Sequence, residues 1–112
     1  MAEESIFLDY VGDNPHMRIV QYLIEGKDFD YTLTDMLNAG VSWGTLNALI
    51  PKFMGLGLIV KTRKIGRATL YKINQNNIAI KQLMGLYHQL LIEKLNHLEQ
   101  EQLPKKKIGV LA

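Results

Sequence analysis

The side chains of this sequence that are best placed for binding chemistry are basic, and they gather in its middle third. Between Gly40 and Asn74 the chain carries six lysines and arginines and no aspartate or glutamate, although the first 38 residues hold eight of the eleven acids. The formal charge is −6 over residues 1–38, +6 over 39–74 and +2 over 75–112. The six basic residues are Lys52, Lys61, Arg63, Lys64, Arg67 and Lys72. Cations without compensating acids are the expected footprint of a polyanion contact, with DNA or RNA as the partner; the alternative is an ordinary solvated surface.

Other kinds of site find little support in the sequence. The absence of cysteine excludes disulfides, thiolate metal ligands and cysteine nucleophiles. His88 and His97 lie nine residues apart in a predicted helix, which places them on nearly opposite faces, and His16 is distant from both. No nucleophile motif, pair of carboxylates in apolar surroundings or phosphate-binding glycine loop is present. We therefore expect no enzyme activity, no metal site and no cofactor.

The composition is that of a globular protein. With 112 residues, of which 47% are hydrophobic and 21% charged, the chain has room for one domain and one added element. No apolar run reaches the roughly 18–20 residues needed to cross a bilayer, so no membrane partner is expected. The first residues lack the basic and apolar regions of a signal peptide, and we expect a cytoplasmic protein.

Capping residues and helical periodicity predict short helices before the basic segment. One is expected at residues 5–11, and a second begins after Asn14, where a capping residue precedes proline, and ends at Gly26. Thr32 and Asp35 resemble a capping box for a third helix, which the following Asn-Ala-Gly stops.

A fourth helix follows after a turn of three or four residues that contains glycine. Ser42 is its expected cap, and its apolar residues recur at helical spacing over about 42–54. Two short helices joined in this way are the signature of a helix-turn-helix. Pro51 deletes the hydrogen bond to the Asn47 carbonyl and costs roughly 3 kcal/mol in a regular helix, so we expect a kink or break there.

The pattern then changes to that of a β-hairpin. Residues 58–64 and 68–73 read as two strands, and the turn between them contains Gly66. A helix-turn-helix followed at once by a hairpin, here called the wing (about 58–73), defines a winged helix. The expected fold is therefore α+β: a winged helix-turn-helix domain with a two-stranded wing and a long C-terminal helix.

The last long segment is a helix too apolar to stand alone. We expect it over residues 76–103, after a DNA-binding domain at 1–75 and before a basic tail at 104–112 that carries Lys105–Lys107. Its stripe can fold back on its own domain and also pair with a second copy, which predicts a homodimer. The expected dimer-interface residues are Met84, Tyr87, Leu91, Leu95 and Leu98. A small-molecule effector site lined by Met84, Tyr87 and His88 is an alternative, but ordinary packing is favoured.

Four segments carry a resemblance to a known family. They are Thr32-Leu-Thr-Asp-Met-Leu, Gly40-Val-Ser-Trp-Gly-Thr-Leu, Gly55-Leu-Gly-Leu-Ile-Val and Gly66-Arg-Ala-Thr-Leu-Tyr-Lys-Ile-Asn. Over residues 12–75 the chain resembles the winged helix-turn-helix transcriptional regulators abundant in archaea and bacteria, and its opening is similar to that of archaeal members. The resemblance implies a sequence-specific regulator that binds double-stranded DNA.

The start of the fourth helix is the expected reader of bases. In a helix-turn-helix the second helix enters the major groove with its N-terminal side chains at base edges. Asn47 can pair with adenine, and the N–H groups of Gly44 and Thr45 can bind a phosphate. Trp43 has an alternative role in packing against the preceding helix. The expected DNA-binding residues outside the wing are Thr32, Ser42, Trp43, Gly44, Thr45, Asn47 and Lys52.

The wing supplies the remaining expected contacts. Strand alternation places Lys61 and Arg63 on the face opposite Val60, and the turn adds Lys64 and Arg67. Arg67, beside a glycine, is the expected minor-groove residue, and the others would hold phosphates.

Two further functions fit the same residues. A winged-helix protein-interaction module in a transcription, replication or partition complex would use the uncharged stretch from Trp43 to Ala48. A non-specific chromatin protein would use the basic wing with few base contacts. The wing cations favour DNA over the first alternative, and only sequence-indifferent binding would favour the second.

Overall fold

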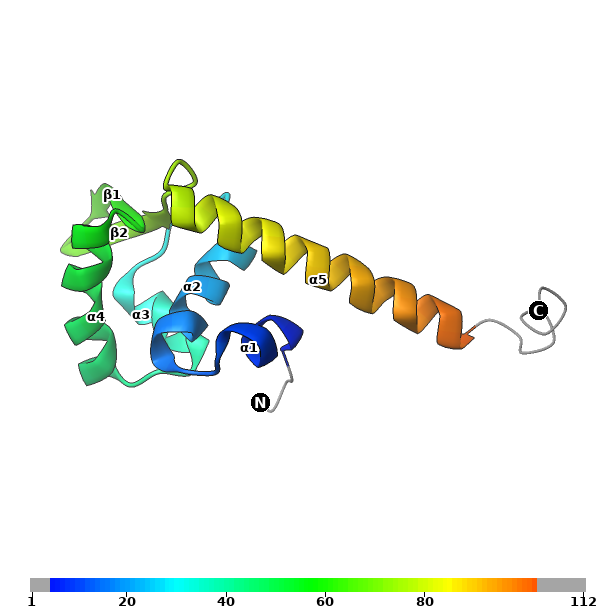
Figure 1. The fold of residues 1–112 in the computed structure, drawn as a ribbon. Helices are drawn as coiled ribbons and strands as arrows, with labels where there is room; N and C mark the ends of the chain where they lie inside the picture. The colour runs from blue at the N-terminus through cyan, green and yellow to red at the C-terminus, as the bar shows by residue number, and fades with distance from the viewer. Residues whose placement is uncertain (1–4, 103–112) are drawn as a thin grey trace, which may run out of the picture.

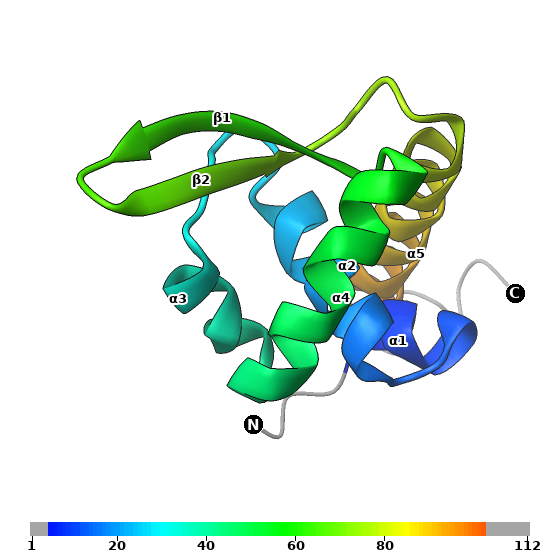
Figure 2. The same ribbon diagram turned by 90° about the vertical axis from the view of Figure 1, so that its left-hand side faces the viewer.

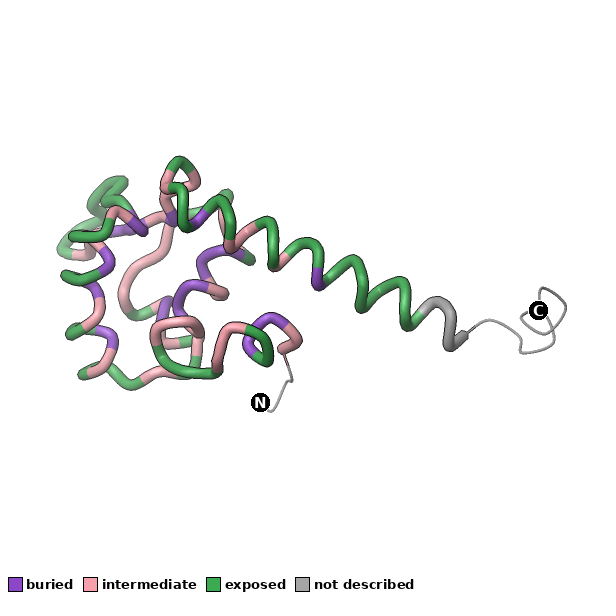
Figure 3. Tube along the Cα trace, viewed as in Figure 1, coloured by how far each residue is buried: buried purple, intermediate pink, exposed green. Residues whose placement is uncertain are grey.

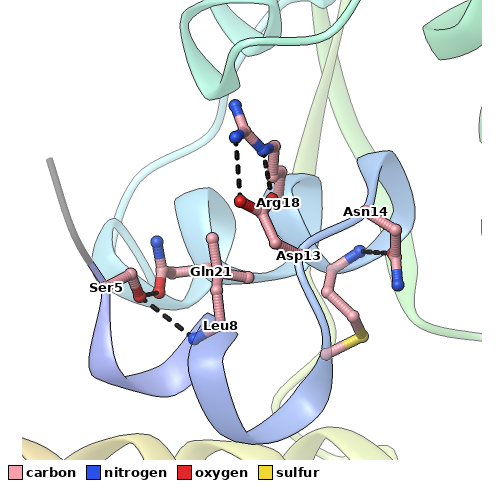
Figure 4. Close-up of polar contacts among 7 residues, drawn as sticks. Ser5, Leu8, Asp13, Asn14, Arg18 and Gln21 are labelled. Carbon is pink, nitrogen blue, oxygen red and sulfur yellow. Dashed lines mark hydrogen bonds and ion pairs between the residues drawn. The ribbon is translucent and has the colours of Figure 1, made fainter. Parts of the chain in front are cut away.

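The computed structural model describes residues 5–102, so the basic segment Lys105–Lys107 lies outside the described residues. Two helices open the fold: α1 (Ile6–Val11) and α2 (Pro15–Glu25). The Ser5 hydroxyl caps α1, accepting a backbone N–H and donating to the Gln21 side chain, which ties α1 to α2 (Figure 4). Asn14 caps α2 through its side-chain oxygen, as expected for a residue that precedes proline.

The helix-turn-helix follows. It consists of α3 (Leu33–Met36), a 3₁₀ turn η1 (Leu37–Ala39) and α4 (Trp43–Leu56). Thr32 and Asp35 form the expected capping box, with reciprocal bonds of 2.9 and 3.1 Å. Gly40 ends η1 at φ +87°, and a Cβ there would lie 2.6 Å from a guanidinium nitrogen of Arg18. The positive φ is what favours glycine in this turn, because the arginine tip could move aside for a Cβ.

The expected break at Pro51 does not occur, because α4 runs through this residue to Leu56. Pro51 is exposed, whereas Leu46 and Phe53 on either side of it are fully buried. Burial of large apolar side chains contributes about 1.5–3 kcal/mol each, enough to offset the cost of a missing N–H. Tertiary packing therefore keeps the helix intact, and Gly57, at φ +75°, ends it.

The wing is an antiparallel hairpin of β1 (Ile59–Ile65) and β2 (Ala68–Ile73). Gly66 takes φ +63° in the tight turn between the strands. On the other side of β2, Tyr31 forms a single bridge to Tyr71 with two backbone hydrogen bonds of 2.8 Å. In Figure 2 the wing projects sideways beyond α3 and α4.

The main core forms where α2, α3, α4, the base of the wing and the start of α5 (Ile78–Gln102) meet. Its fully buried side chains include Ile19, Leu23, Ile24, Met36, Leu46, Phe53 and Ile80. A second cluster of Phe7, Leu8 and Leu90 joins α1 to α5. Beyond this cluster α5 runs away from the body of the domain, and Figure 3 shows residues 91–98 exposed. No helix among residues 5–102 combines the length and the apolar character that crossing a membrane would need.

Candidate nucleic-acid interface

The start of α4 presents its expected contact residues to solvent. Ser42, Gly44 and Asn47 are exposed, and the Trp43 side chain is 50% exposed. Trp43 belongs to neither core cluster, so it is accessible to a partner. Thr45 is only half-buried and completes the group. These residues surround the positive end of the α4 dipole, where backbone N–H groups favour an anion.

Local hydrogen bonds already hold several of these side chains. The Ser42 hydroxyl accepts the Thr45 N–H at 3.2 Å and donates to the Thr45 hydroxyl at 2.9 Å. The Asn47 amide donates to the Trp43 carbonyl at 3.1 Å, so it lies along the helix and must turn outward to meet a base. The Thr32 hydroxyl is engaged in the α3 cap and sits on a half-buried residue.

Gly44 has no packing reason to be glycine. A Cβ at this position would meet nothing within 4 Å, and its φ lies outside the left-handed region. The chain itself would therefore accept alanine, a better helix former by about 1 kcal/mol. Glycine at the first turn of α4 leaves room for a backbone approach from outside, as a phosphate contact requires.

The four wing cations that were expected to contact DNA fall into two groups. Lys61, Lys64 and Arg67 are exposed and, within residues 5–102, have no ion-pair partner, as is also true of Lys52 on α4. Arg63 instead forms a two-pronged ion pair, with Nε 2.9 Å and Nη2 3.1 Å from the carboxylate oxygens of Asp30.

Strand alternation was the wrong basis for placing Lys61 and Arg63 on one face. The register gains a residue between them, so Thr62 forms a β-bulge and the alternation changes phase. As a result Thr62 and Arg63, neighbours in sequence, both contact Asp30. Sequence reasoning missed Asp30 and Thr62, because nothing local indicates a contact that spans 33 positions.

The two sets of candidate contacts lie at one end of the molecule. In Figure 1, α4 and the wing occupy one end, and α5 begins beside the wing and runs away from it, so that its far half projects on the opposite side. The segment that forms α4 and the wing contains no acid, and the nearby Asp30 is neutralised by Arg63. A duplex could thus meet α4 and the wing together while α5 remains free for another contact.

The five expected dimer residues divide between two environments. Met84 and Tyr87 are half-buried and pack on the domain's own core. Leu91, Leu95 and Leu98 are exposed, to 38, 54 and 42%. Ile92, which sequence reasoning omitted, is 51% exposed on the same far half of α5.

The residues considered for an effector do not share one cleft. A solvent-open cavity of about 1040 Å³ lies between α1, α2 and α5, and Tyr87 lines it while Met84 and His88 do not. Elsewhere, burial against Phe53 lowers the pKa of His16, and nearby Lys52 acts in the same direction. Within residues 5–102 no group of three histidines or acids is arranged to hold a metal ion.

Solved structures of other proteins superpose on most of this chain. The adhesin competence repressor AdcR of Streptococcus pyogenes superposes with a TM-score of 0.59 at 16% identity, covering 95% of this chain and 81% of AdcR. Lactococcus lactis ZitR, a zinc-responsive MarR family member solved in complex with DNA, gives 0.56 at 11% identity over 84% of this chain and 66% of ZitR. The chain has a winged helix-turn-helix fold.

A third structure agrees with this assignment. M. tuberculosis Rv0081 superposes on this winged-helix chain with a TM-score of 0.54 at 20% identity, covering 81% of it and 87% of Rv0081. No protein-family model and no curated protein matches the chain. At these identities the similarity shows a shared fold only. The function of this chain must therefore be inferred from the residues on its own surface.

Proposed function

We propose that this winged-helix protein is a sequence-specific regulator of transcription that binds double-stranded DNA. The observation that carries the proposal is the acid-free segment that forms α4 and the wing. It presents the exposed start of α4 and, on the wing, three exposed cations that have no ion-pair partner among residues 5–102. Ser42, Trp43 and Asn47 would face base edges, and the Gly44 N–H would bind phosphate. Lys61, Lys64 and Arg67 would contact the backbone, with Arg67 at the minor groove.

The regulator would act as a homodimer through the far half of α5. Leu91, Leu95 and Leu98 form an apolar stripe that the chain's own domain leaves uncovered, together with Ile92. A helix with such a stripe gains stability by pairing with a copy of itself. Two-fold pairing would present two recognition helices to half-sites about one helical turn apart.

Selection from a randomised duplex pool at about 0.15 M salt tests the proposal. At this salt concentration a sequence-specific protein binds its own site with an affinity orders of magnitude higher than its affinity for other DNA. Enrichment of a palindrome is the expected result. Tight binding without enrichment would instead indicate a non-specific chromatin protein, and no binding would indicate a protein-interaction module. AdcR is named a repressor and ZitR was solved with DNA, which supports the first outcome.

A matched pair of charge variants tests the location of the surface. Lys64→Ala with Arg67→Ala should weaken binding to every sequence and flatten the salt dependence by about 0.9 per lost phosphate contact. Lys81→Ala with Lys94→Ala removes the same charge from exposed positions of α5 and should have little effect. Equal losses in both variants would show that only net charge matters.

A further inference from the structure

Asp30 lies just before the helix-turn-helix and accepts hydrogen bonds from β1 of the wing. Its carboxylate accepts hydrogen bonds from Arg63 Nε at 2.9 Å, Arg63 Nη2 at 3.1 Å and the Thr62 hydroxyl at 2.6 Å. The Asp30 side chain is 17% exposed, whereas that of Arg63 is 60% exposed. One acid is therefore enclosed by two successive residues of β1.

The bulge in β1 is what allows both neighbours to reach this acid. In a regular strand successive side chains point to opposite faces. The extra residue at Thr62 changes that alternation, so Thr62 and Arg63 turn toward Asp30 together. Bulges commonly re-aim side chains in this way.

The segment that carries Asp30 is anchored on two further sides. Tyr31 exchanges two backbone hydrogen bonds with Tyr71 of β2, and Thr32 caps α3. Three successive residues thus contact β1, β2 and the first helix of the helix-turn-helix. This segment therefore links the wing to the start of the helix-turn-helix.

We propose that Asp30 is a positioning residue that aims the wing at DNA, and that Arg63 serves this contact instead of binding a phosphate. The proposal rests on the proposed DNA-binding function. An unpaired carboxylate beside the backbone would repel phosphate, but a two-pronged pair with arginine neutralises it in a defined geometry. Lys61, Lys64 and Arg67 remain as the wing's cations for DNA.

A double-mutant cycle tests the assignment on DNA. Asp30→Ala and Arg63→Ala should each weaken binding by a similar factor, roughly tenfold, and the double variant should lose little more, because both disrupt one contact. Asp28→Ala is the matched control: Asp28 lies in the same loop, its side chain is 72% exposed, and among residues 5–102 its one ion pair is with Lys27. It removes the same charge and should leave affinity unchanged or slightly higher.

The opposite result is equally clear. If Arg63 bound phosphate directly, Asp30→Ala would free it and strengthen binding, whereas Arg63→Ala would weaken binding and lower the salt slope by about 0.9. That pattern would overturn the proposal.

A second experiment uses the free protein and separates this proposal from the proposed function. Because the chain has no cysteine, Ile65→Cys at the wing tip and Ala48→Cys on α4 allow two spin labels at exposed positions. Double electron–electron resonance measures the distance between the two labels. The labelled protein is diluted with unlabelled protein, so that only distances within one molecule are recorded. Asp30→Ala should broaden the distance distribution, and Asp28→Ala should not.

This measurement remains decisive if the wild type binds no DNA. In that case the proposed function fails, while the distances still show whether Asp30 positions the wing. Arg63→Ala provides a second disruption at an exposed side chain and should broaden the distribution in the same way. Unchanged distributions in both variants would overturn the proposal.

Discussion

The Tyr87 hydroxyl of α5 donates a 2.9 Å hydrogen bond to the carboxylate of Glu25, the last residue of α2. The ring also packs edge-to-face on Phe7 of α1, with 5.6 Å between centroids. Tyr87 therefore fastens α5 to both N-terminal helices, one turn before Leu90, beyond which α5 leaves the domain. Two effects raise the pKa of Tyr87 to about 12: burial of its hydroxyl is the larger, and the hydrogen bond to Glu25 is the second.

Tyr87→Phe should lower the free energy of unfolding by about 0.5–1.5 kcal/mol at neutral pH. Because the folded pKa lies above the unfolded value of 10, the contribution is fully present below pH 10 and is lost as pH rises toward 12. Denaturant unfolding of both proteins across this range should show the difference shrinking. Tyr10→Phe, at a side chain 68% exposed, is the control and should show no such trend. A difference that stays constant to pH 12 would contradict this role.

Asp30 should show the complementary behaviour in acid. The Arg63 and Thr62 hydrogen bonds lower its pKa to about 2, from 3.8. Its contribution to stability is therefore present above pH 4 and disappears as pH falls through 2. Wild type and Asp30→Asn should differ in unfolding free energy at pH 5 and converge near pH 2. A gap independent of pH would show that the charge of Asp30 contributes nothing.

Gly44→Ala should separate stability from binding. The substitution should raise stability by up to about 1 kcal/mol, since alanine favours helix and its methyl group meets no atom of the chain. It should weaken DNA binding roughly tenfold by keeping a phosphate from the helix start. Gly55→Ala, at another open position of α4, should stabilise without affecting binding. Equal affinities for the two variants would remove Gly44 from the interface.

Pro51→Ala should stabilise the fold by about 1–3 kcal/mol, because it restores a donor for the Asn47 carbonyl within a continuous helix. Thermal and denaturant unfolding would measure the gain. A neutral or destabilising result would show that the proline ring makes a contact whose loss outweighs the restored bond.

Leu91→Ser with Leu95→Ser should convert the proposed dimer to a folded monomer, because both side chains are exposed within one chain. Light scattering would report the mass and circular dichroism the retained helices. Ile78→Ser, at the most exposed apolar side chain of α5, is the control and should leave the dimer intact. A dimer that survives the double substitution would place the interface elsewhere.

Local chemistry in the sequence determined the elements of this protein. The caps at Asn14, Thr32 and Ser42 and the glycine at the hairpin turn act over a few residues, and the structure confirms each of them. The same signals predicted the winged helix-turn-helix, which the fold confirms. The charge segregation that points to DNA is likewise a property of the sequence.

Contacts between distant residues were decided only by the tertiary structure. Burial of Leu46 and Phe53 overrides the local cost of Pro51, so α4 stays whole. The bulge at Thr62 and the pairing of Arg63 with Asp30 join residues 33 apart, and they give one of the wing's basic side chains an acidic partner. Periodicity placed Tyr87 and Leu95 on one stripe, but only the packing of α5 on the domain shows that Tyr87 is covered and Leu95 is not. Periodicity predicts which residues share a face, whereas the fold decides what that face meets.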